Sequence, residues 1–319
     1  MHLLIGTDEA GYGPNLGPLV VAASAWQTPQ KVKPEYLYEH LSEIIAAEDC
    51  ETDPRLAIAD SKVLYSAGGG LAALESGVLC CLALLGKQPR SAVALWEALA
   101  AECQADRTAL AWHAAEEESL PIDGCSERIG GLIEALPPAF VSAQVELKAL
   151  RACAVFPGRF NAEVERHENK ATVLSLVTMG LIKSILTDFP DLPVKVTCDK
   201  HGGRDRYAHL LQHVFGDDPV RVIQESKDES SYRLNHAGRA VDLRFVAKGE
   251  RFLAAALASM TAKYLREISL RPFNRFWQKH VPDLKPTAGY PADAKRFKAE
   301  IRAAQTRLGI EDRVLWRSR

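Results

Sequence analysis

The chain has 319 residues, of which 47% are hydrophobic and 25% charged, a composition typical of globular proteins and unlike that of disordered, collagenous or coiled-coil chains. Its seven cysteines form no Cys-x-x-Cys pair, so we interpret them as reduced thiols of a cytoplasmic protein. We expect no membrane partner, because the start of the chain lacks the features of a signal peptide and no apolar run approaches the roughly 20 residues of a membrane helix.

Charge is distributed unevenly along the chain. The segment from Arg244 to Arg319 carries 17 Lys and Arg against 7 Asp and Glu, whereas the remainder carries 22 against 34. Solvated helix faces and polyanion binding both account for such a basic segment. The charge alone leaves these two interpretations open.

Hydrophobic spacing and turn residues predict the elements in chain order. Strands are expected at 2–7, 19–26, 139–155, 193–199, 220–224, 232–234 and 241–246, the first two as a hairpin-like pair. Helices are expected at 34–48, 71–85, 91–103, 161–187, 207–214, 251–268, 272–279 and 291–308. Residues 66–138 show no strand signal and are interpreted as a helical insertion. Strands followed by helices on a mixed sheet predict an α/β or α+β core.

The first strand leads into the motif Gly6-Thr7-Asp8-Glu9-Ala10-Gly11-Tyr12-Gly13-Pro14. A dinucleotide-binding loop is excluded, because no helix opens on these glycines. An Asp-Glu pair at a strand end remains. Successive side chains of a regular strand face opposite sides, so Asp8 and Glu9 share a site only if the backbone leaves the strand there. Gly11 and Gly13 would permit that departure; solvated acids at a strand end are the alternative.

Several separated stretches resemble the motifs of ribonuclease HII, the type 2 ribonuclease H family. They are the opening motif with Gly17-Pro18, Asp60-Ser61-Lys62-Val63-Leu64, Asn169-Lys170-Ala171-Thr172, Asp199 after a strand, Lys248-Gly249-Glu250 with the helix through Lys263 and Arg266, and Gly289-Tyr290. They occur in the order of the family and cover about residues 1–65 and 140–319.

The resemblance implies a ribonuclease H-like mixed β-sheet flanked by helices. Residues 1–65 and 139–270 would form the catalytic core, 66–138 the helical insertion and 271–319 a basic C-terminal helical segment. The implied activity is hydrolysis of RNA in RNA-DNA hybrids, or at ribonucleotides embedded in duplex DNA, with Mg²⁺ or Mn²⁺ as cofactor. The products would carry 5′-phosphate and 3′-hydroxyl ends, and the oligomeric state is left open.

The same resemblance assigns the site residues. Asp8, Glu9, Asp199 and Glu250 would be the catalytic carboxylates that bind metal, with Asp8 bridging two ions. Hard oxygen ligands suit Mg²⁺ and Mn²⁺, and the sequence offers no matching His/Cys set. Nucleic-acid contacts are expected from Gly11, Tyr12, Gly13, Lys62, Lys263, Arg266 and Tyr290. Four carboxylates without metal would repel one another, so metal is expected to stabilise the fold.

The chain departs from the pattern of the family in named places. Tyr12 stands where the family has a basic residue, and Glu250 stands where it has an Asp. The spacing from Glu250 to Ser259 is also one residue shorter than in the family. These features favour the alternative function, a nucleic-acid-binding relative that has lost efficient catalysis. His201 is interpreted either as a proton carrier near the metal or as a turn residue. The tail Trp316-Arg317-Ser318-Arg319 is expected to contact a duplex.

Overall fold

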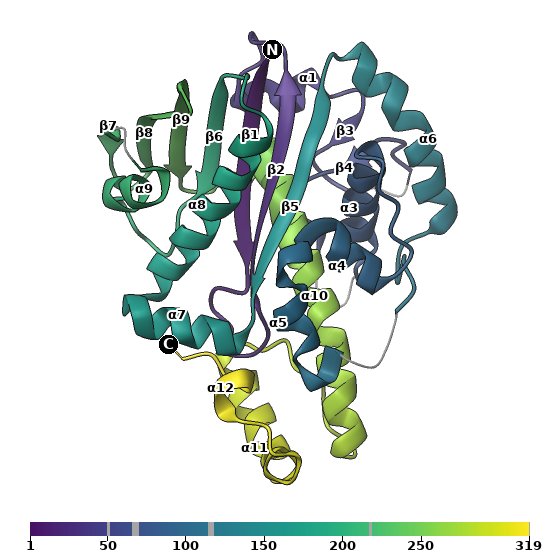
Figure 1. Cartoon of the computed structure of the whole chain (residues 1–319). Helices are drawn as coiled ribbons and strands as arrows, with labels where there is room; N and C mark the ends of the chain where they lie inside the picture. The colour runs from purple at the N-terminus through teal and green to yellow at the C-terminus, as the bar shows by residue number, and fades with distance from the viewer. Residues whose placement is uncertain (50–51, 66–69, 114–117, 217–218, 319) are drawn as a thin grey trace.

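The computed structural model describes residues 1–49, 52–65, 70–113, 118–216 and 219–318. Within these residues a seven-stranded sheet has the strand order β5-β2-β1-β6-β9-β8-β7, and a small second sheet pairs β3 with β4. Figure 1 shows the large sheet with helices packed around it and the C-terminal helices α11 and α12 below. An α/β fold with a mixed sheet flanked by helices is confirmed.

The large sheet contains both parallel and antiparallel strand pairs. β1 runs antiparallel to β2 and parallel to β6, β6 runs parallel to β9, and the pairs β2–β5, β8–β9 and β7–β8 are antiparallel. The strands of the large sheet are β1 His2–Ala10, β2 Leu19–Thr28, β5 Glu146–Val155, β6 Val194–Asp199, β7 Arg221–Glu225, β8 Glu229–His236 and β9 Arg239–Val246, and those of the small sheet are β3 Ile45–Ala46 and β4 Leu56–Ala57. The predicted hairpin-like pair of β1 and β2 is confirmed.

The helices comprise long core elements and short turns. They are η1 Pro34–Tyr36, α1 Leu37–His40, α2 Ser61–Leu64, α3 Ala72–Leu84, α4 Ala92–Ala100, η2 Ala101–Cys103, α5 Gln104–Thr108, η3 Ala111–His113, α6 Ser126–Ser142, α7 Pro157–His167, α8 Lys170–Asp188, α9 Ala208–Phe215, η4 Gly249–Arg251, α10 Leu253–His280, α11 Pro291–Leu308 and α12 Asp312–Leu315.

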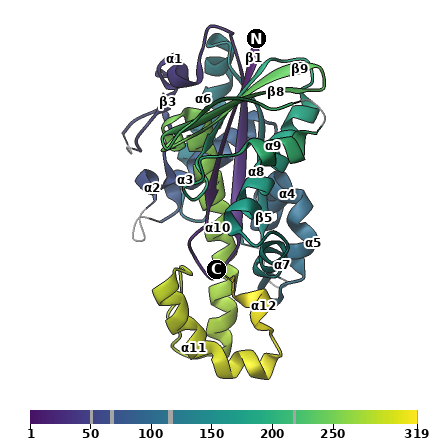
Figure 2. The ribbon, with the colours of Figure 1, turned by 90° about the vertical axis from the view of Figure 1, so that its left-hand side faces the viewer.

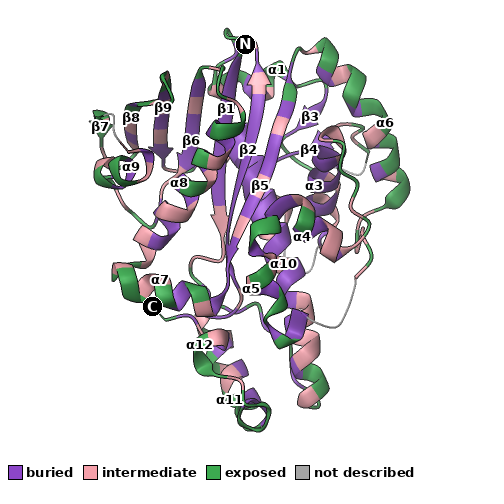
Figure 3. Cartoon of the chain, in the orientation of Figure 1, coloured by how far each residue is buried: buried purple, intermediate pink, exposed green. Residues whose placement is uncertain are grey.

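Alternation along the strands gives the sheet two apolar faces. Leu4 belongs to a core that includes residues of α3 and α10, whereas Leu3 and Ile5 belong to a core that includes residues of α8 and α9. This is the period of two expected when both faces of a strand are covered. Figure 2 shows the sheet edge-on between these layers, and Figure 3 shows that the central strands are buried.

Gly6 sets the spacing between β1 and α10. A Cβ atom at this position would lie 2.1 Å from the backbone nitrogen of Ala255 and 2.2 Å from the carbonyl carbon of Ala254. Only a residue without a side chain permits this approach. The contact fixes α10 over the strand that carries Asp8.

Four predicted elements need correction. Of residues 34–48, only 34–40 are helical, as the short helices η1 and α1, and residues 45–46 form the strand β3. The strand predicted at 139–155 begins at residue 146, because α6 continues to Ser142 despite Pro137 and Pro138 within it.

The other two corrections concern helix ends. The helix predicted at 161–187 is split into α7 and α8, because Glu168 adopts a left-handed conformation and the Asn169 side chain accepts hydrogen bonds from the first amides of α8. The helix predicted at 272–279 is the continuation of α10, which runs through Pro272. There Phe273 and Trp277 are buried, so tertiary packing outweighs the cost of the proline.

Residues of the predicted insertion pack into the main core. α3 contacts α10, and the buried residues of α3 and α4 belong to the same apolar cluster as those of β2. The fully buried Glu75 accepts hydrogen bonds at 2.7 Å from the backbone amides of Ile122, Asp123 and Gly124, and at 2.8 Å from the hydroxyl of Tyr264. These four donors satisfy a carboxylate that would otherwise be costly to bury. They connect the insertion to α10.

By length and composition α8 could cross a membrane, with 19 residues and a mean hydropathy of 1.4. The expectation that no apolar run approaches this length therefore needs correction. One face of α8 is buried, and 44% of its apolar window lies inside the protein. Met179, Ile182 and Ile185 are inaccessible to solvent in the core that also contains β1 and β6, so the helix is apolar because it covers the sheet.

Candidate metal centre

Three of the four predicted carboxylates converge where β1 and β6 end. These parallel neighbours are in register at Thr7 and Cys198, which brings Asp8, Glu9 and Asp199 to one edge of the sheet. One carboxylate oxygen from each residue lies within 4.8 Å of those of the other two. This oxygen cluster is the candidate metal centre.

The expectation that the backbone must leave the strand at Asp8 is wrong. β1 continues to Ala10, with Asp8 paired to Ala22 and Glu9 to Val21. On the other side, however, the pairing with β6 ends at Thr7 and Cys198. Both acids therefore lie just beyond the point where β1 and β6 stop pairing, and one carboxylate oxygen of each lies within 4.8 Å of the other.

Burial and mutual repulsion perturb these acids. Burial raises the pKa of Asp8 to about 7, and the charges of Asp199 and Glu250 add to the rise, although a hydrogen bond from Ser259 opposes it. Burial and the charges of Asp8 and Asp199 raise the pKa of Glu9 well above its ordinary value. Burial also raises the pKa of Asp199, against a 2.9 Å hydrogen bond from the Gly249 amide. Without a cation the three charges oppose one another.

Glu250 lies beside this cluster and is not one of its three members. It sits on η4, directly after Gly249, and its carboxylate is close enough to raise the pKa of Asp8 and of Asp199. Its Oε1 is 3.7 Å from Nζ of Lys62. A Cβ atom at position 249 would lie 2.9 Å from Cα of Asp199, so Gly249 allows η4 to approach the end of β6.

Lys62 is the predicted basic residue that the structure places next to the carboxylates. Its side chain is 78% exposed. Burial alone would lower its pKa, but the charges of Asp60, Glu250 and Asp8 produce a net rise. Lys62 is therefore a cation that faces both the acids and solvent, as a phosphate contact requires.

A pair of serines supports Asp8 and was not predicted as part of the site. The hydroxyls of Ser61 and Ser259 are 2.9 Å apart, and Ser259 is hydrogen-bonded to Asp8. Asp60 caps α2 by accepting a hydrogen bond from the Lys62 amide at 3.0 Å. Both serines lie in motifs that the sequence singles out, yet their contact joins residues 198 positions apart, which no local pattern reveals.

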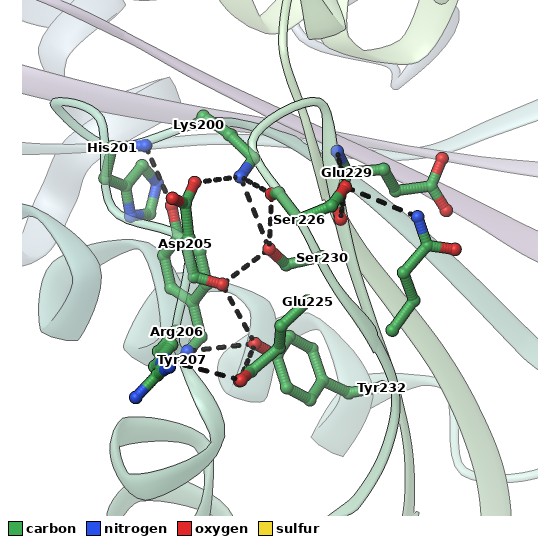
Figure 4. Close-up of polar contacts among 11 residues, drawn as sticks. Lys200, His201, Asp205, Arg206, Tyr207, Glu225, Ser226, Glu229, Ser230 and Tyr232 are labelled. Atoms are coloured by element: carbon green, nitrogen blue, oxygen red, sulfur yellow. Dashed lines mark hydrogen bonds and ion pairs between the residues drawn. The ribbon is translucent and has the colours of Figure 1, made fainter.

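The loop after Asp199 is anchored to the β7–β8 hairpin, as Figure 4 shows. Nζ of Lys200 donates to Oδ1 of Asp205 and to the carbonyl of Ser226, both at 2.6 Å. The hydroxyl of Ser230 donates to the carbonyl of Asp205, also at 2.6 Å. This network holds the chain on the far side of Asp199 and so helps to fix the position of its carboxylate.

His201 does not act as a mobile proton carrier in this arrangement. It is 2% exposed, and its Nδ1 is 2.9 Å from the hydroxyl of Ser175. Burial, with a smaller effect from Arg204, lowers its pKa to about 3. The interpretation as a turn residue is the one that this environment favours.

The opening turn presents Tyr12 near the acids. Gly11 has a φ of 89°, and a Cβ atom there would lie 2.6 Å from the carbonyl oxygen of Pro18, whereas a Cβ at Gly13 would meet nothing within 4 Å. Nζ of Lys170 lies 4.7 Å from the centre of the Tyr12 ring, a cation–π distance. Lys170 lies in a motif of the resemblance but was not predicted as a nucleic-acid contact. Lys170 thus places a positive charge beside the Tyr12 ring.

The three predicted contacts of the C-terminal quarter have different environments. Lys263 pairs with Glu267 at 2.7 Å, and Tyr290 is 52% exposed. Arg266 is 1% exposed and donates to the carbonyl of Ala288 at 2.7 Å. The prediction that Arg266 contacts a phosphate directly therefore needs correction, because its guanidinium is inside the protein and holds a loop there.

The tail needs a similar correction at Arg317, which is 1% exposed. Its guanidinium donates to the carbonyls of Gly11 and Pro14, and its backbone amide donates to the carbonyl of Asn15 at 2.9 Å. Arg317 thus holds the opening turn in place and is inaccessible to a duplex. Arg319 lies outside the described residues.

No protein-family model matches the sequence, and no curated protein matches it significantly. Among solved structures, the chain is similar to ribonuclease HII of Archaeoglobus fulgidus from its complex with PCNA, with 16% identity, a TM-score of 0.44 and coverage of 99% of this chain and 94% of that one. The chain is also similar to ribonuclease H2 of Pyrococcus horikoshii OT3, with 14% identity, a TM-score of 0.44 and coverage of 98% of this chain and 92% of that one. Its similarity to Bst-RNase HIII in complex with Mn²⁺ has 13% identity, a TM-score of 0.43 and coverage of 99% of this chain and 65% of that one.

Proposed function

We propose that the protein is a metal-dependent endoribonuclease. It hydrolyses RNA within RNA-DNA hybrids, or at ribonucleotides embedded in duplex DNA, and leaves 5′-phosphate and 3′-hydroxyl ends. The observation that carries the proposal is the convergence of Asp8, Glu9 and Asp199 from two strands. The motifs around these residues resemble those of ribonuclease HII and supply the substrate class.

The donor set fits Mg²⁺ or Mn²⁺. It consists of carboxylate oxygens, which these hard cations prefer. Burial and repulsion raise the pKa of each of the three acids, and a cation would relieve that repulsion. Divalent ions bound there would activate the attacking water and neutralise the leaving 3′-oxygen of a phosphodiester.

The chain's own residues would position the nucleic acid. Lys62 faces both the acids and solvent and would contact a phosphate near the scissile bond. The Tyr12 ring would pack on a sugar or base while Lys170 beside it contacts the backbone. Ser259 holds Asp8 in place through its hydrogen bond.

A binding protein with little catalysis is the second candidate. The observation that favours it is the position of Glu250, which pairs with Lys62 and stands outside the group of three oxygens. Such a protein would bind the same duplex through the same cations. It would lack a complete set of metal ligands.

Cleavage assays separate the two functions. The purified protein is incubated with a labelled RNA-DNA hybrid, a DNA duplex that contains a single ribonucleotide, and plain duplex DNA, each with Mg²⁺ or Mn²⁺. We expect cleavage at ribonucleotides only, and its loss in Asp8→Asn. Glu134→Gln, at an exposed position of α6, removes a carboxylate elsewhere and should cleave as the wild type does. Tight binding of the hybrid without cleavage in either metal would establish the second candidate.

A further inference from the structure

An open groove of about 660 Å³ lies on the sheet face opposite α8 and α9. Along β6, Lys195 alternates with Val194 and Val196, which are buried in the core that contains α8 and α9, so Lys195 points to the other face. Strands β6 to β9 form the floor of the groove, and residues 33–36 form one wall. The chemistry proposed above does not use this groove.

Two ion pairs shape the groove. Arg244 of β9 pairs with Glu35 of η1 at 2.6 Å and ties the wall to the floor. Arg233 of β8 pairs with Asp242 of β9 at the same distance. These pairs neutralise both acids that line the groove.

Three further cations line the groove, and one of them, Lys195, is close enough to Glu35 to help lower the pKa of that acid. Lys33, Lys195 and Arg221 form no ion pair with any residue in the described parts of the chain. The lining therefore has a surplus of positive charge, in a protein whose formal net charge is −2. A surplus of this kind favours the binding of a polyanion over that of an apolar ligand or a peptide without acidic residues.

The groove lies next to the candidate metal centre. The guanidinium of Arg244, at the groove, is 4.6 Å from the centre of the Phe252 ring, and that of Arg251, the residue after Glu250, is 4.9 Å from the same centre. Asp199 and Lys195 lie on the same face of β6, about 13 Å apart at the rise of an extended strand. A chain of phosphates leaving the carboxylates would therefore meet Arg251 and Arg244 before it reaches Lys195.

We propose that this groove binds a single-stranded stretch of nucleic acid that flanks the substrate duplex. The inference rests on the proposed function, because the strand belongs to the same substrate. Tyr36 is 54% exposed and Ile223 is 55% exposed at the groove. Unpaired bases can stack on such side chains, whereas bases within a duplex are already stacked on one another. The cations hold the backbone and Tyr36 holds a base.

The test compares a blunt RNA-DNA hybrid with the same hybrid that carries a single-stranded DNA overhang at its 3′ or 5′ end. Binding is measured by fluorescence anisotropy without divalent metal, so that no strand is cut. The full chain should bind one of the overhang substrates about tenfold more tightly than the blunt one, since one stacked base alone supplies that much. Cleavage of the blunt hybrid with Mg²⁺ or Mn²⁺, measured separately, tests the proposed function itself.

Paired variants locate the effect. The variant Lys195→Ala/Arg221→Ala should lose most of the overhang preference. The negative slope of log affinity against log salt for the overhang substrate should also become shallower by about 1.4. Tyr36→Ala should also reduce the preference. The control Lys87→Ala/Arg90→Ala removes two exposed cations from the loop between α3 and α4 and should keep the preference. Thermal unfolding checks that all variants are folded.

Several results would overturn the inference. Equal affinity of the wild type for blunt and overhang substrates would do so while leaving any cleavage, and with it the proposed function, intact. An equal loss of preference in the control variant would show a general charge effect. Displacement of the overhang by an acidic peptide at comparable concentration would identify the groove as a peptide site.

Discussion

At the scale of single residues, burial decides what each ionisable group can do. Asp8 is 9% exposed and close to two other carboxylates, so its pKa rises to about 7. Lys62 and Glu250, less than 4 Å apart, remain in contact with solvent. The site thus combines buried acids that need a cation with an exposed cation that faces a ligand.

Asp8→Asn should stabilise the metal-free protein and abolish its stabilisation by metal. The amide removes one of the mutually repelling charges and can still accept the hydrogen bond from Ser259. We expect the melting temperature without metal to rise by about 2–4 °C for each kcal/mol of repulsion removed. Differential scanning fluorimetry with EDTA and with millimolar Mg²⁺ or Mn²⁺ measures both effects. A wild-type melting temperature indifferent to metal would contradict the prediction.

Two buried histidines should each reduce the stability of the protein as the pH falls, against the opposite effect of the three acids, whose raised pKa values favour the folded state at low pH. Burial lowers the pKa of His201 and of His113 to about 3, whereas the unfolded chain titrates near 6.5. Below pH 6.5 these two groups therefore bind more protons in the unfolded state, and their contribution to stability falls with pH until about pH 3. Each histidine contributes about 1.4 kcal/mol per pH unit in this window. Urea unfolding between pH 6.5 and 4.5 gives the free energy of unfolding as a function of pH, and its slope should be smaller in His201→Gln than in the wild type. An unchanged slope would contradict the assignment of this effect to His201.

The sequence identified the acids of the site but not the residues that support them. Asp8, Glu9 and Asp199 were assigned through the resemblance of their motifs, and the structure brings these three acids together. Ser259 and Lys170 act through contacts with distant segments. The sequence does not distinguish the buried Arg266 from an exposed arginine. Only the packing of the folded chain separates the two cases.

At the scale of elements, local signals placed the ends of some helices correctly, although the capping residue Asn169 at the start of α8 was missed. α11 spans the predicted range, with Pro291 in its first turn and the left-handed Gly309 after its end. Ser91, the first residue of the helix predicted at 91–103, caps α4 by accepting a hydrogen bond from the Ala94 amide. Prolines inside α6 and α10 misled the prediction, because tertiary packing retains these helices.

Gly6→Ala should destabilise the fold and disturb the site. The new methyl group would meet the backbone of α10, which cannot move aside as a flexible side chain would. We expect a loss of about 1–3 kcal/mol in the free energy of unfolding, measured by urea denaturation. In the control Gly180→Ala on α8, a Cβ atom meets nothing within 4 Å, so stability should hold or rise slightly. Equal effects in both variants would contradict the close approach.

At the scale of the whole molecule, the two ends of the chain support each other. Asn161 of α7 donates to the carbonyls of Arg313 and Trp316 at 2.9 and 2.8 Å and accepts from the Ser318 amide at 2.7 Å. The tail in turn places Arg317 against the opening turn. Sequence patterns could not reveal this, because the partners are about 150 to 300 residues apart.

Asn161→Ala should release the tail and loosen the opening turn. Three backbone groups would lose their partner, at about 0.5–1.5 kcal/mol for each hydrogen bond. Hydrogen exchange should accelerate in residues 311–318 and also in residues 11–15, which Arg317 holds. The exposed Asn235 of β8 provides the matched control Asn235→Ala. Faster exchange in the tail alone would show that the two segments are independent.

The most direct test of the metal centre is a crystal structure of the protein with Mn²⁺, in which anomalous scattering locates the ions. The convergence of three acids predicts an anomalous peak within coordination distance, about 2.0–2.6 Å, of oxygens from Asp8 and from Glu9 or Asp199. A second peak that Glu250 ligates would indicate a two-ion site. Absence of any peak between these carboxylates at millimolar Mn²⁺, in crystals where the acids are ordered and ionised, would contradict the account.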